Sequence, residues 1–198
     1  ERLRATGLFS DVSLSAIDTG VPGRKDVQIE VEERDTIGRW DIGGGASRGR
    51  GEVGYFRLEH TNFDLFALPK SPGNWANAFV GGGQSIYAEI IPGNEESRYT
   101  FGFHEPYFFS TSRAFILRTG SQIFRRDIYD ENRFTTEPEI RQYLDSDHRL
   151  SLSLGWRLDD IKIGQIDSGA PLSISADRAE VLLSYPRLSL RYLNLENN

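Results

Sequence analysis

Apolar and polar residues alternate without interruption between Arg149 and Asp160. The apolar positions are Leu150, Leu152, Leu154, Trp156 and Leu158, and small or charged residues fill the positions between them. A period of two predicts a β-strand with one apolar face. Strands of soluble proteins usually contain about 5–6 residues, whereas a tilted strand needs about 9–11 to cross a bilayer. This segment is therefore long enough to cross a membrane, and we expect its apolar side chains to face lipid.

The same alternation recurs along most of the chain. Tyr99, Phe101 and Phe103 share one face of another predicted strand, where we also expect lipid contact. The candidate strands are Arg39–Ser47, Glu52–Asn62, Gln84–Ile91, Arg98–Phe109, Arg113–Asp127, His148–Ile163 and Leu183–Leu195. In the last strand Arg187 and Arg191 lie opposite the leucines, as expected if their face lines water, because arginine is costly on a lipid face. The pattern predicts an antiparallel transmembrane β-barrel over residues 36–198.

The connections between these strands are expected to differ at the two ends of the sheet. The segment 92–97 and the long acidic segment 129–147 are predicted to be loops at one end, with a short turn at Ser110–Ser112 at the other. Short turns at one end and long polar loops at the other are typical of outer-membrane barrels. The segment 63–83 departs from this rule, because it is long and lies at the short-turn end.

Large apolar side chains gather in this insertion at 63–83. They are too numerous for a free loop, which is normally polar. We therefore expect an ordered protrusion that contacts a partner or the preceding domain through Phe63, Leu65, Phe66, Trp75 and Phe79.

Residues 1–35 have a different pattern from the rest. Glu1–Phe9 is predicted to be the last part of a helix that stops at Gly7, a residue favoured just past helix ends. Two short strands, Val12–Ile17 and Asp26–Glu33, follow on either side of a turn-rich segment. This region is expected to be the end of a small α+β module outside the membrane. Because the chain starts at Glu1 and contains no Met, we expect it to be an internal piece of a longer protein.

Composition excludes several classes of function. The chain has 198 residues, no cysteine and a net charge of −6, so thiol chemistry is absent and nucleic-acid binding is not expected. Mean hydropathy is −0.46, and no apolar run approaches the roughly 18 residues of a transmembrane helix. A barrel is compatible with this value, because alternating strands average to a polar hydropathy.

No motif for catalysis, metal binding or a cofactor stands out. His60, His104 and His148 fall on separate predicted segments without ligand spacing, so no metal site is expected. The stretch Gly49–Gly54 fits a dinucleotide fingerprint but opens no helix, which favours a β-turn. No nucleophile elbow is present, and we expect neither an enzyme nor a bound cofactor.

Several weak motifs occur together in the order of one known family. They are Gly7–Val12, Val27–Arg34, Gly81–Ser85, Phe101–Phe108, Asp160–Ile163 and Leu188–Tyr192. The chain resembles the outer-membrane assembly factor BamA and its relatives. The resemblance implies the end of a POTRA domain at residues 1–35, followed by the N-terminal half of a transmembrane barrel, about seven strands, at 36–198. The insertion at 63–83 is longer than the family's usual turn.

The resemblance implies that the protein folds and inserts client outer-membrane barrels. A barrel with a weakly paired edge offers backbone groups on which a client can add strands. The expected client-binding strand contains Trp40, Asp41, Ile42, Gly43, Gly44, Gly45 and Ala46. The alternative for the glycines is that they only ease barrel curvature.

Partners and location follow from the same resemblance. The expected partners are outer-membrane lipids, unfolded clients, and accessory lipoproteins or periplasmic proteins. The expected location is the bacterial outer membrane, with the N-terminal region in the periplasm. Competing hypotheses are a POTRA-fed secretion pore or passive channel, and a barrel that anchors a larger protein in the membrane.

Overall fold

The computed structural model describes residues 8–33, 38–48, 51–73, 78–166, 169 and 180–194. These residues form antiparallel strands, which confirms the prediction of a mostly β protein. The chain divides into two compact units, residues 1–38 with 61–83, and residues 39–60 with 84–198. In the described part, no helix has the length and apolar character needed to cross a membrane.

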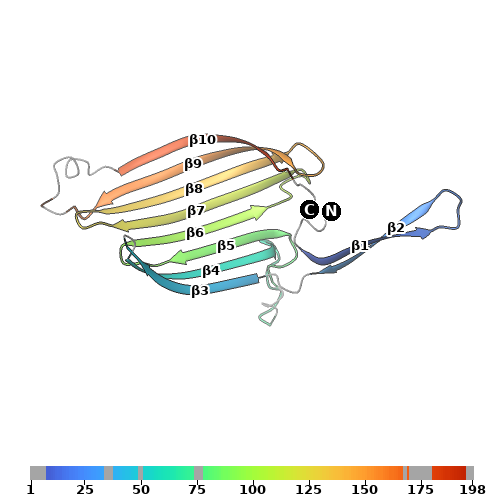
Figure 1. The fold of residues 1–198 in the computed structure, drawn as a ribbon, viewed down its shortest axis with the longest axis horizontal. Coiled ribbons are helices and arrows are strands. Elements are labelled where there is room, and N and C mark those ends of the chain that lie inside the picture. The colour runs from blue at the N-terminus through green and yellow to red at the C-terminus, as the bar shows by residue number, and fades with distance from the viewer. Residues whose placement is uncertain are drawn as a thin grey trace. The chain divides into compact units, whose positions relative to one another are not determined.

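The first unit contains a hairpin of β1 (Phe9–Asp18) and β2 (Lys25–Glu33) (Figure 1). Its turn contains Gly20 and Gly23 at φ angles of 75° and 80°, which side-chain-bearing residues rarely adopt. Both strands predicted in this region are thereby confirmed. The predicted helix falls mostly on residues 1–7, outside the described residues, and Phe9 belongs to a strand rather than to that helix.

In its described residues, 63–73 and 78–83, the insertion extends the pairing of the strand that precedes it. Phe63 forms a β-bridge with Val80, and the backbone N–H of Asp64 donates to the carbonyl of Phe79 at 2.8 Å. The rings of Phe63 and Phe79 stack with centroids 5.8 Å apart. Backbone pairing and ring stacking together hold the base of the insertion closed.

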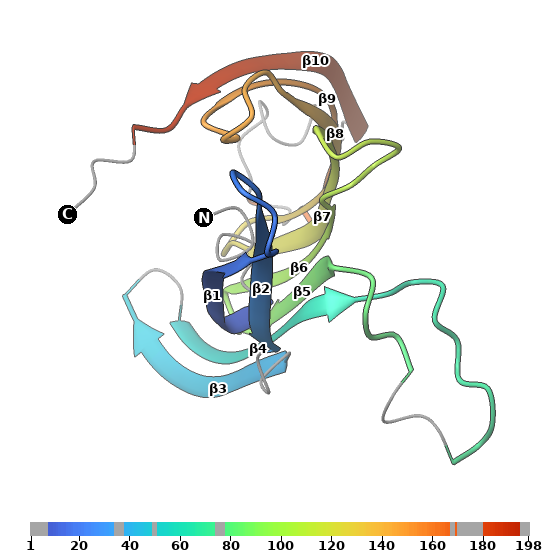
Figure 2. The same ribbon diagram turned by 90° about the vertical axis from the view of Figure 1, so that its right-hand side faces the viewer.

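The second unit is built on one antiparallel sheet of eight described strands, in the order β10-β9-β8-β7-β6-β5-β4-β3 (Figure 1). The strands are β3 (Gly38–Ser47), β4 (Gly51–Phe63), β5 (Gln84–Ile91), β6 (Glu96–Glu105), β7 (Arg113–Arg125), β8 (Asp130–Tyr143), β9 (Leu150–Gly164) and β10 (Glu180–Tyr192). Each strand pairs with its neighbour in sequence, so the sheet is a meander. It is strongly curved, and β3 and β10 form its two edges (Figure 2).

The prediction of a long acidic loop over residues 129–147 is wrong, because β8 occupies most of it. Its side chains alternate between charged residues such as Glu137 and Glu139 on one face and apolar residues such as Phe134 and Ile140 on the other. The charged face pairs with charged groups of β7 and β9, so it needs no apolar residues. A strand whose one face is charged lacks the hydrophobic signal that identified the others.

The added strand also changes the connections. The connections at the end where β3 meets β4 include residues 48–50, 92–95 and 126–129, which are short. Those at the other end include residues 106–112 and 144–149, together with the insertion. The expectation of long loops at the first of these ends is therefore wrong for the connections 48–50, 92–95 and 126–129. Residues 165–179, which join β9 to β10, are the long connection at that end.

Asp145 closes the connection between β8 and β9. Its carboxylate accepts hydrogen bonds from the backbone N–H groups of Leu150 at 2.7 Å and Arg149 at 3.1 Å. These bonds, the one from Leu150 most of all, hold the pKa of Asp145 below its usual range. The turn is therefore stabilised at neutral pH and weakens as the pH falls through the lowered pKa, where protonation removes the charged acceptor.

Candidate functional site

In this sheet the polar face is buried and the apolar face is exposed, which is the reverse of a sheet in a soluble protein. On β9 the buried positions include Ser151, Ser153 and Asp159, whereas Leu154 is 60% exposed and Trp156 is 48% exposed. The sheet is curved (Figure 2), and on a curved sheet the side chains of the concave face lie closer together than those of the convex face. The polar residues therefore shield one another on the inner face, while the apolar residues are left uncovered on the outer face.

The residues predicted to face lipid all lie on the outer face. Tyr99, Phe101, Leu152, Leu154 and Trp156 are exposed, while Phe103, Leu150 and Leu158 are half-buried. Cross-strand pairing places Phe103 opposite Leu117 and Leu154 opposite Leu188, so the apolar face continues over β7 and β10. An apolar face of this extent fits contact with hydrocarbon, which stays a prediction.

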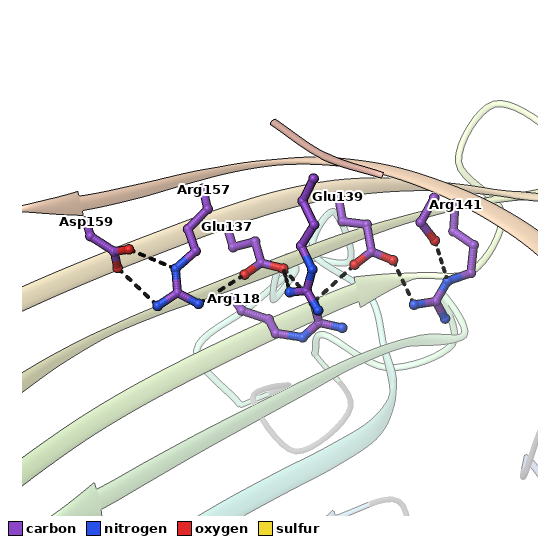
Figure 3. A network of polar contacts seen from close by, with 8 residues as sticks. Arg118, Glu137, Glu139, Arg141, Arg157 and Asp159 are labelled. Atoms are coloured by element: carbon purple, nitrogen blue, oxygen red, sulfur yellow. Dashed lines mark hydrogen bonds and ion pairs between the residues drawn. The ribbon is translucent and has the colours of Figure 1, made fainter. Parts of the chain in front are cut away.

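A network of ion pairs crosses the inner face around Glu137 on β8 (Figure 3). The side chain of Glu137 is 6% exposed. Its carboxylate lies 2.7 Å from a guanidinium nitrogen of Arg187, 3.6 Å from Arg118 and 3.7 Å from Arg157. Charges from β7, β8, β9 and β10 are thus joined through one buried carboxylate.

The network extends along the strands from this centre. Glu139 accepts from Arg118 at 3.2 Å and from Arg141 at 2.7 Å. Arg157 makes a two-pronged contact with Asp159, at 2.9 and 3.2 Å. Planar guanidinium groups match carboxylates in this way, and the pairing satisfies charges that would otherwise be costly to bury.

The pattern of residues along the chain does not predict most of this network. Glu137, Glu139 and Arg141 fall within the expected loop at 129–147, although their positions two residues apart place them on one face of a strand. Pro138, a residue that disfavours strands, lies between Glu137 and Glu139, and strand alternation places it on the opposite face. The alternation of charged residues with uncharged ones is the sequence signal that identifies this strand.

The predicted client-binding residues lie on β3, at one edge of the described sheet. Trp40 and Ile42 are 66% and 74% exposed. Gly43 lies against the ring of Tyr55, where an added Cβ would be 3.1 Å from the ring, whereas Gly45 has nothing within 4 Å. Part of the glycine run thus accommodates an aromatic ring, and part of it faces open space. Asp41 bonds to Arg39 of its own strand, and Gly44 and Ala46 are exposed.

The predicted partner-contact residues of the insertion separate into two groups. Phe63 and Phe79 stack on each other and close its base. Leu65 and Phe66 are 49% and 81% exposed. Trp75 lies outside the described residues.

Comparisons with known proteins agree with this architecture. Residues 78–173 match the Omp85 superfamily domain, a stretch that contains β5 to β9 and the centre of the ion-pair network but not β3. The chain is similar to the crystal structure of BamA from Haemophilus ducreyi lacking POTRA domains 1–3, with a TM-score of 0.59 and 16% sequence identity. The match covers 100% of this chain and 37% of that one. A search of curated proteins finds no match. The resemblance seen in the sequence and the predicted barrel fold are confirmed.

Proposed function

We propose that the chain, whose residues 78–173 match the Omp85 superfamily domain, is part of an outer-membrane assembly factor. In this proposal the protein inserts client β-barrels and acts through backbone pairing rather than catalysis. An unfolded strand cannot enter hydrocarbon without partners for its N–H and C=O groups. A barrel strand with a free edge can supply those partners one client strand at a time.

The observation that carries this proposal is the position of β3 at the edge of the sheet. Within the described sheet β3 has one neighbour, β4, and its other edge is where the closing strand of a complete barrel would pair. Gly45 has no side chain, so a closing strand that separates from β3 loses no side-chain contact there. The exposed side chains of Trp40 and Ile42 offer apolar surface to a client strand. Pairing along this edge rests on backbone hydrogen bonds, which a client strand can replace.

A disulfide lock tests the proposal in the full-length protein. Asp41→Cys, cross-linked to a cysteine on the closing strand of the barrel, should stop assembly of client barrels while leaving this barrel folded. The matched control links Gly43→Cys to Tyr55→Cys, two positions in contact across β3 and β4. This control immobilises the same strand but leaves its outer edge free, so it should keep client assembly near the wild-type rate.

Two results would count against lateral templating. One is wild-type client assembly by the locked protein, which would favour a secretion pore or passive channel. The other is equal loss in the lock and in the β3–β4 control, because rigidity of β3 rather than access to its edge would then be the cause.

We also propose that the outer face of the sheet contacts outer-membrane lipid and that the N-terminal unit lies in the periplasm. The exposed apolar side chains of β6, β9 and β10 support the lipid contact. The hairpin before β3 has the acidic residues Glu30 and Glu32 exposed, which fits an aqueous compartment better than hydrocarbon.

The insertion is proposed to bind an accessory or periplasmic partner through Leu65 and Phe66. Phe66→Ser removes an exposed side chain without disturbing the stacked base, so the barrel should fold and partner capture should fall. Lys70→Ser, an exposed polar change in the same segment, is the control. Unchanged partner capture by the Phe66 variant would remove this surface from the proposal.

A further inference from the structure

A hollow lies on the inner face of the sheet beside the Glu137 network. Its volume is about 240 Å³, and β5 to β9 all contribute to its lining. Among the described residues, four arginines surround it, namely Arg98, Arg118, Arg133 and Arg157. Neither the strand-templating mechanism nor the lipid contact uses this hollow.

The formal charges around the hollow nearly balance, but the exposed charge is positive. The four arginine side chains are between 31% and 43% exposed. Their carboxylate partners Glu96, Glu131, Glu137 and Asp159 are between 6% and 21% exposed. The carboxylates therefore lie beneath the guanidinium groups, and a molecule entering the hollow meets mainly cationic N–H donors.

The arginines keep hydrogen-bonding capacity in this arrangement. A guanidinium has five N–H donors, and Arg98 contacts Glu96 through Nη2, as Arg133 contacts Glu131. Glu96 and Glu131 thus each engage one nitrogen of their arginine and leave other donors for a ligand, whereas all three nitrogens of Arg157 already contact carboxylates.

The floor of the hollow is shaped by Gly120. A Cβ at this position would lie 2.6 Å from the backbone oxygen of Tyr99, so a larger residue would force the strands to shift. Thr100 and Thr135 lie directly beside Gly120 on the neighbouring strands and add hydroxyl groups to the lining, although the Thr135 hydroxyl donates to Asp159 at 2.5 Å. The site therefore combines a low floor, hydroxyl groups and a surrounding wall of guanidinium groups.

From these features we infer that the inner wall holds an oxyanion-binding site for a phosphate or carboxylate group. Guanidinium forks match both groups in geometry and charge, and partial burial strengthens such hydrogen bonds relative to bulk water. The ligand enters from the inner face and contacts the arginines without displacing their carboxylates.

Calorimetric titration of the purified full-length protein tests this inference, with inorganic phosphate and citrate as separate probes at constant chloride concentration. Wild-type protein should bind at least one probe saturably. Arg118→Gln and Arg133→Gln should each weaken binding about tenfold, the effect of losing one charge-assisted hydrogen bond. Arg133→Lys keeps the charge but loses the fork, so its affinity should fall between those of wild type and Arg133→Gln.

Arg149→Gln is the matched control, because Arg149 is similarly exposed and ion-paired but lies in the β8–β9 connection. Circular dichroism of each variant verifies that the sheet has folded. Binding of phosphate alone assigns the site to phosphate groups, and binding of citrate alone assigns it to carboxylates. If the wild type shows no saturable binding, or if Arg149→Gln loses as much affinity as the Arg118 and Arg133 variants, the arginines only stabilise the sheet. Either result would leave the role of β3 untouched.

Discussion

Leu154 tests the assignment of the outer face at the scale of one residue. It lies in the middle of β9, is exposed, and pairs with another exposed leucine, Leu188. Leu154→Arg should lower the free energy of unfolding in lipid vesicles by about 2–4 kcal/mol if the side chain lies near the bilayer midplane. Denaturant titration of the vesicle-inserted protein measures this change.

Leu154→Ala separates the cost of charge from the loss of the leucine side chain. It should destabilise the barrel clearly less than Leu154→Arg, and equal effects would contradict lipid contact. The neighbouring Ser153 is unsuitable as a harmless site for arginine. It is buried and accepts a hydrogen bond from Arg141 at 3.2 Å, so a second arginine there would meet like charge.

Glu137 tests the inner network in the same way. Glu137→Gln leaves the guanidinium groups around it without their shared charge, and should destabilise the protein by about 2 kcal/mol. Glu180→Gln is the control, because Glu180 also contacts a cation, Lys162 at 2.7 Å, but both side chains are more than half exposed. Its effect should stay within about 0.5 kcal/mol. Equal losses in the same unfolding titration would mean that burial of Glu137 has no energetic role.

At the scale of the strands, close packing on the inner face depends on Gly102 of β6. The ring of Tyr87 on β5 covers this glycine, and an added Cβ would overlap the ring. Gly102→Ala should therefore cost about 1–3 kcal/mol through overpacking, and shortening the ring in a Tyr87→Leu background should recover part of this loss.

Gly45→Ala provides the contrast on the edge strand. Nothing lies within 4 Å of its added Cβ, and alanine restricts the unfolded chain, so stability should stay the same or rise by about 0.5 kcal/mol. Unfolding titrations that rank the two alanine variants in the opposite order would contradict the strand packing described above.

For the whole molecule, the proposed membrane topology puts the two ends of the strands on opposite sides of the outer membrane. Asp18 lies in the N-terminal hairpin, and Asp127 lies in the β7–β8 connection, at the end opposite the start of β3. A membrane-impermeant thiol reagent should label Asp127→Cys on intact cells, and Asp18→Cys only after the outer membrane is permeabilised. Labelling of Asp18→Cys on intact cells would contradict a periplasmic N-terminal unit.

The sequence by itself determined the class of the protein and the orientation of its most regular strands. In β9 the apolar and polar residues alternate, and since side chains of a strand point alternately to its two faces, the face of each residue follows from its position. The same reasoning correctly assigned Phe101 and Gly102, and likewise Leu188 and Arg187, to opposite faces of their strands. The family could be recognised because its motifs fall on these strands.

Only the tertiary structure identified β8 and the hollow beside it. Glu137 and Arg157 are twenty positions apart, and nothing local to either residue shows that the other will neutralise it. A charged strand face is stable only when neighbouring strands bring opposite charges within a few ångströms, which depends on register across the sheet. The tertiary fold also decided which charges remain exposed, because the curvature buries the carboxylates and leaves the arginines facing the hollow.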